Sequence, residues 1–201
     1  MNKKKVIKEV VYKYGGVAKT ADFVSEGLTN YEVSNLCNSG YIRRVRHGFY
    51  QMAEEHDASE EQLLAALLPE GIVCMESALF HYGYSDFSPR IWTVAVPRTI
   101  ARTKVSIEGV PLKAYYIQEK QYMIGKTVAK FNGVKLAIYN RERTICDCFK
   151  YRTRLDNELF NKAINAYVAD ENKSLSNLSR YAKEMGLYKR VMNVMEVLIN
   201  G

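Results

Sequence analysis

Short hydrogen-bonding side chains gather in one stretch of the sequence, and a group of basic side chains follows directly. The first group offers hydroxyl and amide groups: Thr29, Asn30, Tyr31, Ser34, Asn35 and Asn38. The second group is Arg43, Arg44, Arg46 and His47. Asn and Ser side chains bond base edges, whereas arginines neutralise phosphates. The chemistry that these side chains would support is recognition of a nucleic acid.

The elements that would position these groups follow from hydrophobic spacing. Residues 2–14 carry apolar side chains at spacings of three and four, which predicts a helix, and a short helix follows from Thr20. Thr29 with Glu32 three residues later forms a capping box for a third helix. Residues 41–45 and 49–52 read as two strands joined by a glycine turn. This order predicts a winged helix-turn-helix over residues 1–52.

In such a domain the second helix of the pair enters the major groove, and the wing lies along the backbone or in the minor groove. We therefore expect the ten polar and basic residues named above to bind double-stranded DNA. Strand alternation sends Arg43 and Arg44 to opposite sides, so which of them faces DNA stays open. The alternative is a small helical cap whose charged hairpin only stabilises the rest of the protein.

Catalytic chemistry has little support in the sequence. Ser77 lacks the glycines of a nucleophile elbow, and neither a phosphate-binding loop nor an HExxH motif occurs. The histidines His47, His56 and His81 lie in three different segments. His81, near Glu76 and Ser77, is the best catalytic candidate, with a hydrogen-bonded, partly buried histidine as the alternative. We expect no catalytic residue and no enzymatic activity.

The four cysteines, Cys37, Cys74, Cys146 and Cys148, lack the paired spacing of a zinc site. No secretion signal accompanies them, so a disulfide framework is not expected either. The sequence predicts reduced thiols in the core, no metal and no cofactor.

Charge is unevenly distributed along the 201 residues. Residues 1–52 hold nine Lys and Arg against four Asp and Glu, residues 53–88 hold none against eight, and residues 89–201 hold twenty against ten. Two basic blocks thus flank an acidic one, which points to phosphate-bearing partners. No apolar run is long enough to span a membrane, and we expect a cytoplasmic protein.

The rest of the chain predicts a second domain. Residues 53–70 are an acidic segment and a helix that link it to the first. Residues 71–201 show strand patterns up to Tyr139, with Asn132-Gly133 as a hairpin turn, and helical patterns from there to the end. The fold class expected is α+β, with an N-terminal winged helix-turn-helix plus a C-terminal antiparallel sheet with a helical bundle.

A helix after Asn140 has a pattern of its own. Asn140 is a suitable cap, and Ile145, Cys148 and Phe149 fall on one apolar side, with Arg143, Asp147 and Lys150 expected outside. Arginine side chains lie at both ends of this helix, and their guanidinium groups can form paired hydrogen bonds with carboxylates or phosphates. The alternative is a solvated face with internal salt bridges.

Four stretches occur in an order that resembles a known family. They are the N-terminal winged-helix pattern, "VCMESALFHYGYSD", "RIWTVAVPR" and "NRERTICDCFKYRTRL". In this order and spacing they resemble the AbiEi antitoxins of bacterial abortive-infection, type IV toxin–antitoxin systems, over nearly the whole chain. Abortive infection is a form of phage defence.

The resemblance implies an autorepressor whose winged helix binds inverted repeats at its own promoter. It also implies a C-terminal domain that counteracts a nucleotidyltransferase-like toxin, with no stable toxin complex required. By resemblance, toxin antagonism is carried over to basic C-terminal positions: Arg141, Arg143, Lys150, Arg152 and Arg154. The family supplies no catalytic residue to carry over.

Several points stay open at the level of sequence. The C-terminal domain could act as an enzyme or as a competitor for a tRNA-like substrate, or it could inhibit the toxin by direct contact. Inverted-repeat operators fit two copies of the protein, but the chain has no heptad seam for dimerisation. We expect a monomer in solution and two copies on DNA.

Overall fold

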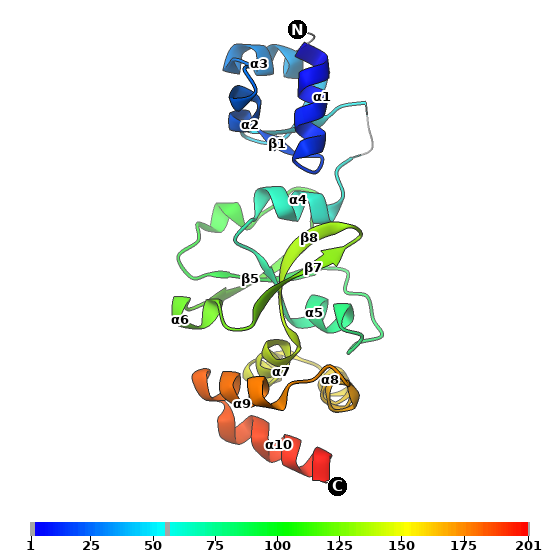
Figure 1. Cartoon of the computed structure of the whole chain (residues 1–201), viewed down its shortest axis with the longest axis vertical. Helices are drawn as coiled ribbons and strands as arrows, with labels where there is room; N and C mark the ends of the chain where they lie inside the picture. Colours follow the sequence, from blue (N-terminus) through cyan, green and yellow to red (C-terminus); the bar gives the residue numbers. More distant parts are fainter. Residues whose placement is uncertain (1–2, 55–56, 201) are drawn as a thin grey trace. The chain divides into compact units, whose positions relative to one another are not determined.

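The structure, a computed structural model, describes residues 3–54 and 57–200, which form two compact units (Figure 1). The N-terminal unit holds the chain up to Pro69 together with the short segments 107–110 and 131–134. The C-terminal unit holds the remainder. The expected linker groups with the N-terminal unit as far as Pro69, and its residues 55–56, among them His56, lie outside the described residues.

Three helices and a small sheet build the first part of the N-terminal unit. They are α1 (Lys3–Lys13), β1 (Ala18–Lys19), α2 (Thr20–Ser25), α3 (Asn30–Asn38), β2 (Ile42–Arg46) and β3 (Phe49–Met52). The strands pair antiparallel in the order β1-β3-β2. This arrangement confirms the predicted winged helix-turn-helix, because the hairpin β2–β3 follows the third helix as a wing.

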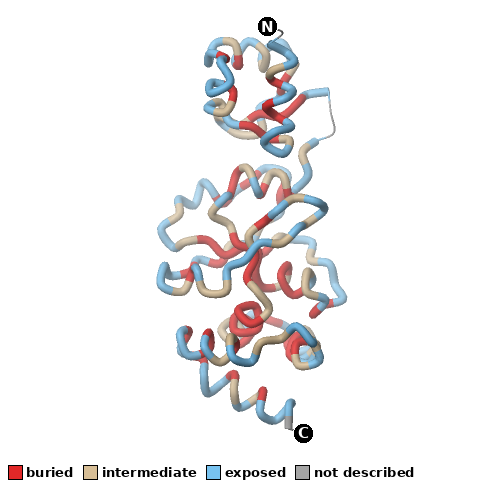
Figure 2. The backbone as a smooth tube through the Cα atoms, viewed as in Figure 1, coloured by how far each residue is buried: buried red, intermediate tan, exposed pale blue. Residues whose placement is uncertain are grey.

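One apolar core holds these elements together (Figure 2). Ile7 and Val10 of α1 meet Phe23 of α2, Val33 of α3 and Ile42 of β2, and all five are buried. Burial of a side chain of this size stabilises a fold by about 1.5–3 kcal/mol. The core therefore fixes which faces of α3 and of the wing remain outside.

Helix α4 (Glu60–Leu67) closes the N-terminal unit. Ser59 caps it, accepting a hydrogen bond from the backbone of Gln62, and Leu64 and Leu67 are buried. A Cβ atom on Gly16, which has φ +98°, would lie 2.8 Å from Nε2 of Gln62. The glycine therefore allows α4 to pack closely against the turn after α1.

The C-terminal unit is built on a mixed sheet. Its strands are β4 (Ile72–Val73), β5 (Trp92–Pro97), β6 (Leu112–Ile117), β7 (Lys126–Phe131) and β8 (Val134–Tyr139), in the order β6-β5-β4-β8-β7. The α+β class is confirmed, but the sheet is not purely antiparallel, because β5 pairs parallel with β6 and β4 with β8. Residues 98–111 connect β5 to β6. A parallel pair needs such a long connection, because the chain must return to the end of the sheet at which β5 begins.

Helices complete the unit, and the last four long ones form the predicted bundle. They are α5 (Met75–His81), η1 (Arg102–Lys104), α6 (Glu119–Tyr122), α7 (Arg141–Lys150), η2 (Arg152–Arg154), α8 (Asn157–Ala169), α9 (Leu175–Glu184) and α10 (Tyr188–Asn200). Among residues 3–54 and 57–200, no helix has both the length and the apolar character needed to cross a bilayer.

Helix α7 is the centre of the C-terminal unit rather than an amphipathic cover. Every residue from Glu142 to Phe149 is buried, as the red coil in Figure 2 shows. The expectation that Arg143 and Asp147 face outward is therefore wrong. The reason is that α7 contacts α5 on one side and α8, α9 and α10 on others, so it has no side left for solvent.

Candidate nucleic-acid interface

Local hydrogen bonds fix the start of α3. Thr29 Oγ1 accepts from the backbone of Glu32 at 3.2 Å, and the Glu32 carboxylate accepts from the backbone of Thr29 at 2.8 Å. Lys3 of α1 forms an ion pair with the same carboxylate. The hydrogen bond from Lys3, with those from Thr29, lowers the pKa of Glu32 to about 2. The first turn of α3 is thus anchored to α1 as well as capped.

One face of α3 is polar and exposed. Val33 points into the core, whereas the side chains of Asn30, Tyr31, Ser34, Asn35 and Asn38 are all exposed. The Tyr31 side chain has 74% of its surface exposed. The structure therefore brings together every α3 residue that the sequence assigned to DNA contact.

The wing separates its first two arginines. Arg44 lies opposite Tyr50, and Arg43 lies opposite Gln51. Because Tyr50 belongs to the core beneath the helices, Arg44 shares the helix-bearing face of the sheet, and its guanidinium lies 5.7 Å from the Tyr50 ring centroid. Residues opposite each other in a ladder point to the same face, so Arg43 belongs to the other face.

Arg43 is engaged on that other face. Its guanidinium forms an ion pair with Asp57, whose carboxylate also accepts a hydrogen bond from Gln51 Nε2 at 3.2 Å. Gln51 Oε1 in turn accepts from the backbone of Ala58 at 3.3 Å. Arg43 thus pairs with the segment before α4, on the face of the wing opposite Arg44.

The tip of the wing meets the start of α2. Gly48 supplies the left-handed turn with φ +76°, and its carbonyl accepts from the backbone of Thr20 at 2.9 Å. Lys19, exposed at this point, lies with its ammonium 5.7 Å from the Phe49 ring centroid. Lys19 therefore joins Arg46 and His47 at one end of the sheet. Lys19 precedes the wing by more than twenty residues, so its position in the sequence does not indicate this proximity.

Comparison with known proteins bears on this part of the chain. A sequence model of the family described as transcriptional regulator, AbiEi antitoxin, matches residues 5–53. Residues 5–53 are an AbiEi-family domain. This match confirms the family resemblance, and it covers the three helices and the wing, the region that contains all ten predicted DNA-contact residues.

The fold of the whole chain has a counterpart among solved structures. The crystal structure of the Rv2827c protein from Mycobacterium tuberculosis aligns with 97% of this chain and 79% of its own, with a TM-score of 0.60 and 12% sequence identity. At this identity the likeness concerns the fold alone. A comparison with curated protein sequences gives no match.

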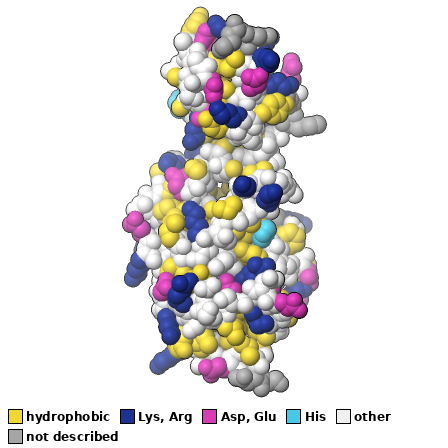
Figure 3. Space-filling view, in the orientation of Figure 1, with side chains coloured by type: hydrophobic (Ala, Val, Ile, Leu, Met, Phe, Trp, Pro, Cys, Tyr) yellow, Lys and Arg dark blue, Asp and Glu magenta, His cyan; other side chains and the backbone are white. Residues whose placement is uncertain are grey.

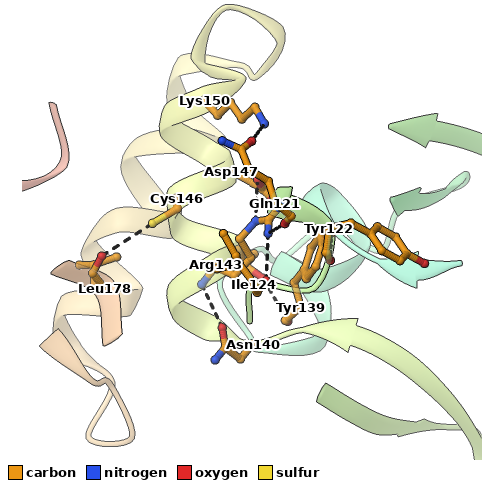
Figure 4. Close-up of polar contacts among 11 residues, drawn as sticks. Gln121, Tyr122, Ile124, Tyr139, Asn140, Arg143, Cys146, Asp147, Lys150 and Leu178 are labelled. Atoms are coloured by element: carbon orange, nitrogen blue, oxygen red, sulfur yellow. Dashed lines mark hydrogen bonds and ion pairs between the residues drawn. The ribbon is translucent and has the colours of Figure 1, made fainter. Parts of the chain in front are cut away.

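In the C-terminal unit, one of the five basic residues predicted to antagonise a toxin lies in the interior. Arg143 is fully buried, and its Nε donates to Asp147 at 3.1 Å (Figure 4). Its Nη1 donates to the carbonyl oxygens of Gln121 and Ile124, and its guanidinium lies 4.0 Å from the Tyr139 ring centroid. The carry-over of toxin contact to Arg143 is therefore not supported, because none of its surface is accessible.

Arg141 is also committed to internal contacts. Its Nε donates to Asp170 at 2.8 Å, and its guanidinium lies 4.8 Å from the Tyr82 ring centroid. Burial alone would raise the pKa of Asp170, but hydrogen bonds from Tyr84, the Asn172 backbone and Arg141 outweigh it and lower the pKa to about 2. Arg141 is half-buried and keeps one side toward solvent.

The remaining three basic residues differ in accessibility. Lys150 donates to Gln121 Oε1 at 2.8 Å and is half-buried. Arg152 lies 4.3 Å from the Phe160 ring centroid, whereas Arg154 is exposed. Figure 3 shows basic side chains spread over this face of the C-terminal unit, interspersed with acidic ones. Because Arg143 is fully buried, the five predicted residues do not form one basic patch on the surface.

The groups that could do covalent or metal chemistry are poorly placed for it. The thiols of Cys74, Cys146 and Cys148 are free and buried, and burial raises the pKa of Cys146 to about 12. His81 is half-buried beside Tyr82, where burial and then Arg141 lower its pKa. Across residues 3–54 and 57–200, no group of three His, Cys, Asp or Glu side chains is arranged to hold a metal ion.

Proposed function

We propose that this protein is an autorepressor and antitoxin that binds inverted repeats in double-stranded promoter DNA through α3 and the wing. The observation that carries the proposal is the exposed face of α3, where five polar or aromatic side chains lie within an AbiEi-family domain. A helix that only supported the fold would need polar side chains on this face, but not a concentration of groups that can bond base edges. Asn side chains bond adenine in a bidentate manner, and each such pair discriminates by about 1–3 kcal/mol.

The wing supplies the electrostatic part of the same interface. Arg44, Arg46, His47 and Lys19 present positive or hydrogen-bonding groups at the helix-bearing face and the tip of the sheet. Phosphate contacts of this kind position a protein on DNA and make its affinity depend on salt. We propose that Arg44 and Lys19 each neutralise one phosphate.

For the C-terminal unit, we propose neutralisation of a nucleotidyltransferase-like toxin without catalysis and without a stable complex. The support for this role is the match of residues 5–53 to a family described as an antitoxin. Of the basic positions first considered, Arg154 is exposed, while Arg141, Lys150 and Arg152 are half-buried, so these four remain candidates. Their test is rescue of growth in cells that express the neighbouring toxin gene, with protein abundance measured in parallel.

The first experiment for DNA binding compares two duplexes. The full-length protein is titrated against a duplex from upstream of its own gene and against a scrambled duplex, over a series of salt concentrations. We expect tight binding to the first only, with log affinity falling linearly with log salt. Equal, weak binding to both duplexes would contradict sequence-specific repression.

Two neighbouring arginines provide a matched pair of variants. Arg44→Ala should weaken binding to the operator and reduce the magnitude of the salt slope by about one, because one phosphate contact is lost. Arg43→Ala removes the same charge from the face that holds Asp57 and should leave the slope unchanged. Equal effects of the two substitutions would refute this assignment of the wing faces.

Base contact needs a separate variant. Asn35→Ala combined with Arg46→Ala should abolish operator binding, because it removes a base contact and a wing contact together. Asn35→Ala alone should cost about 1–3 kcal/mol on the operator and much less on the scrambled duplex. Unchanged operator binding by the double variant would remove the site from α3 and the wing.

A further inference from the structure

The C-terminal unit contains a pocket that the proposed function does not use. It has a volume of about 390 Å³ and lies between the start of α5, the loop after α5 and the first turns of α8. Its wall is mostly apolar, with Phe87, Pro89 and Leu159 among the lining residues. A volume of this size lies within the range of small ligand sites and takes a few side chains of a partner.

An exposed aromatic residue marks one edge of the pocket. Phe87 has 76% of its surface exposed, the largest fraction among the exposed large hydrophobic side chains described. An isolated apolar residue on a surface needs no explanation, but here it borders an apolar cavity. The pocket and Phe87 together offer one continuous apolar contact for a side chain from outside.

Acidic groups surround this apolar surface. The lining includes four carboxylates, Glu76, Asp86, Asp156 and Glu158, against the single ammonium of Lys162. Lys162 forms an ion pair with Asp86, and Asp156 caps α8 by accepting from the backbone of Glu158 at 2.7 Å. For the Glu158 carboxylate itself, the described part of the chain shows no hydrogen bond or ion pair. The pocket therefore keeps a surplus of negative charge in a chain whose total charge is +7.

One carboxylate oxygen in the wall has an unused bonding capacity. Glu76 Oε1 accepts from Lys113 at 3.4 Å, whereas Glu76 Oε2 is buried and has no hydrogen-bond partner within residues 3–54 and 57–200. A buried acceptor without a partner destabilises the folded chain, and more so when it is charged. A donor brought by a partner would satisfy this oxygen after the Glu76 side chain turns toward the pocket.

We propose that this pocket docks a segment of another protein that presents an arginine between apolar side chains. Arginine fits best because its planar guanidinium has five N–H donors and can bond two carboxylates while its aliphatic stem covers apolar surface. The guanidinium would bond the exposed Glu158 carboxylate and, once the Glu76 side chain turns toward the pocket, Glu76 Oε2, while the flanking apolar side chains would pack on Phe87 and Leu159. A polyamine would satisfy the carboxylates but would leave the apolar wall uncovered.

The test uses the full-length, ¹⁵N-labelled protein and the capped tripeptide Leu-Arg-Leu as the probe. Its matched control is the same tripeptide with citrulline in place of arginine, which keeps the shape and removes the charge. We expect amide shift changes confined to residues 76, 85–89 and 156–162, with the citrulline peptide binding at least about tenfold more weakly. Equal binding of the two peptides, or changes centred elsewhere, would overturn the proposal.

Variants separate the pocket from general attraction of a cation. Glu158→Gln and Phe87→Ser, both at exposed positions, should each weaken binding of Leu-Arg-Leu at least about fivefold, from the loss of one charge-assisted hydrogen bond or one apolar contact. Glu184→Gln, an exposed carboxylate at the end of α9, should leave it unchanged. Equal loss in all three variants would mean non-specific attraction and would contradict the proposal.

Two other occupants would give distinct results, and each would overturn the proposal. If spermidine bound as tightly as the peptide and shifted the same amides, the site would be one for small polycations. If the protein alone self-associated, and Phe87→Ser abolished this, the pocket would hold a second copy of the chain. Light scattering over a concentration series, run on the same samples, decides the latter point.

Discussion

Residues of one type, close together in the sequence, have different roles in this protein. Arg43 and Arg44 are neighbours, yet one holds the segment before α4 and the other lies on the helix-bearing face of the wing. Arg141 and Arg143 are two positions apart, yet the first reaches solvent and the second is fully buried. Composition alone therefore overstates how much positive charge is available to a partner.

The buried arginine leads to a prediction about stability. Arg143→Ala should destabilise the C-terminal unit by about 3–5 kcal/mol, because it leaves Asp147 buried without its ion-pair partner. Urea unfolding followed by tyrosine fluorescence would measure the change. Lys189→Ala, at an exposed position of α10, should change stability by less than about 0.5 kcal/mol. A loss below about 1 kcal/mol for Arg143→Ala would contradict the assigned role.

Asp170 predicts a pH dependence. Because its pKa is lowered in the folded state to about 2, its ionised form contributes stability above the ordinary pKa of an aspartate, and this contribution is lost as pH falls from about 4 to 2. Asp170→Asn should lower stability at pH 7 by about 1 kcal/mol. The difference from the wild type should shrink at pH 3 in the same unfolding assay. A difference independent of pH would exclude the ionised carboxylate as its cause.

At the scale of elements, a tight joint connects the sheet to the helical bundle. The carbonyl of Gly125, just before β7, accepts from the backbone of Asn140 at 2.7 Å, and Asn140 caps α7 by accepting from the backbone of Arg143 at 3.0 Å. Arg143 closes the joint through the carbonyl oxygens of Gln121 and Ile124. The start of α7 is thus held by the segment that leads into β7.

The joint can be tested with two glycines. A Cβ atom on Gly125 would lie 2.4 Å from Cβ of Arg143, whereas one on Gly83 would meet nothing within 4 Å, and both glycines have similar positive φ values of +71° and +74°. Gly83→Ala should cost about 1 kcal/mol from backbone strain alone. Gly125→Ala should cost at least about 2 kcal/mol more, because it also overpacks the joint. Thermal unfolding of both variants measures these losses. Equal decreases in Tm would show that the close approach of Gly125 to Arg143 does not affect stability.

At the scale of the whole molecule, the proposed function makes a prediction about stoichiometry. Light scattering coupled to size exclusion should give one chain per particle in solution and two chains per duplex when the duplex carries an inverted repeat. A duplex with a single half-site should bind one chain, because the symmetry of the operator determines the number of copies. A stable dimer in the absence of DNA would contradict this expectation.

Much of the fold could be predicted because the signals are local. The capping boxes, the glycine stops and the Asn132-Gly133 turn, with φ values of 47° and 85°, act within a few residues of sequence. The α3 candidate residues were predictable for the same reason, since a single buried position, Val33, orients the whole helix. The parallel strand pairs were not, because neither pair joins strands through a short turn.

The sequence by itself determined the winged helix-turn-helix and the polar face of α3, because helical periodicity and capping depend on neighbours along the chain. Only the tertiary structure decided that α7 is buried all round, that Arg43 pairs with Asp57 while Lys19 lies beside Phe49 of the wing, and that an acidic pocket forms beside Phe87. These features depend on which elements pack together. Packing partners far apart in the chain leave no periodic signal in a single sequence.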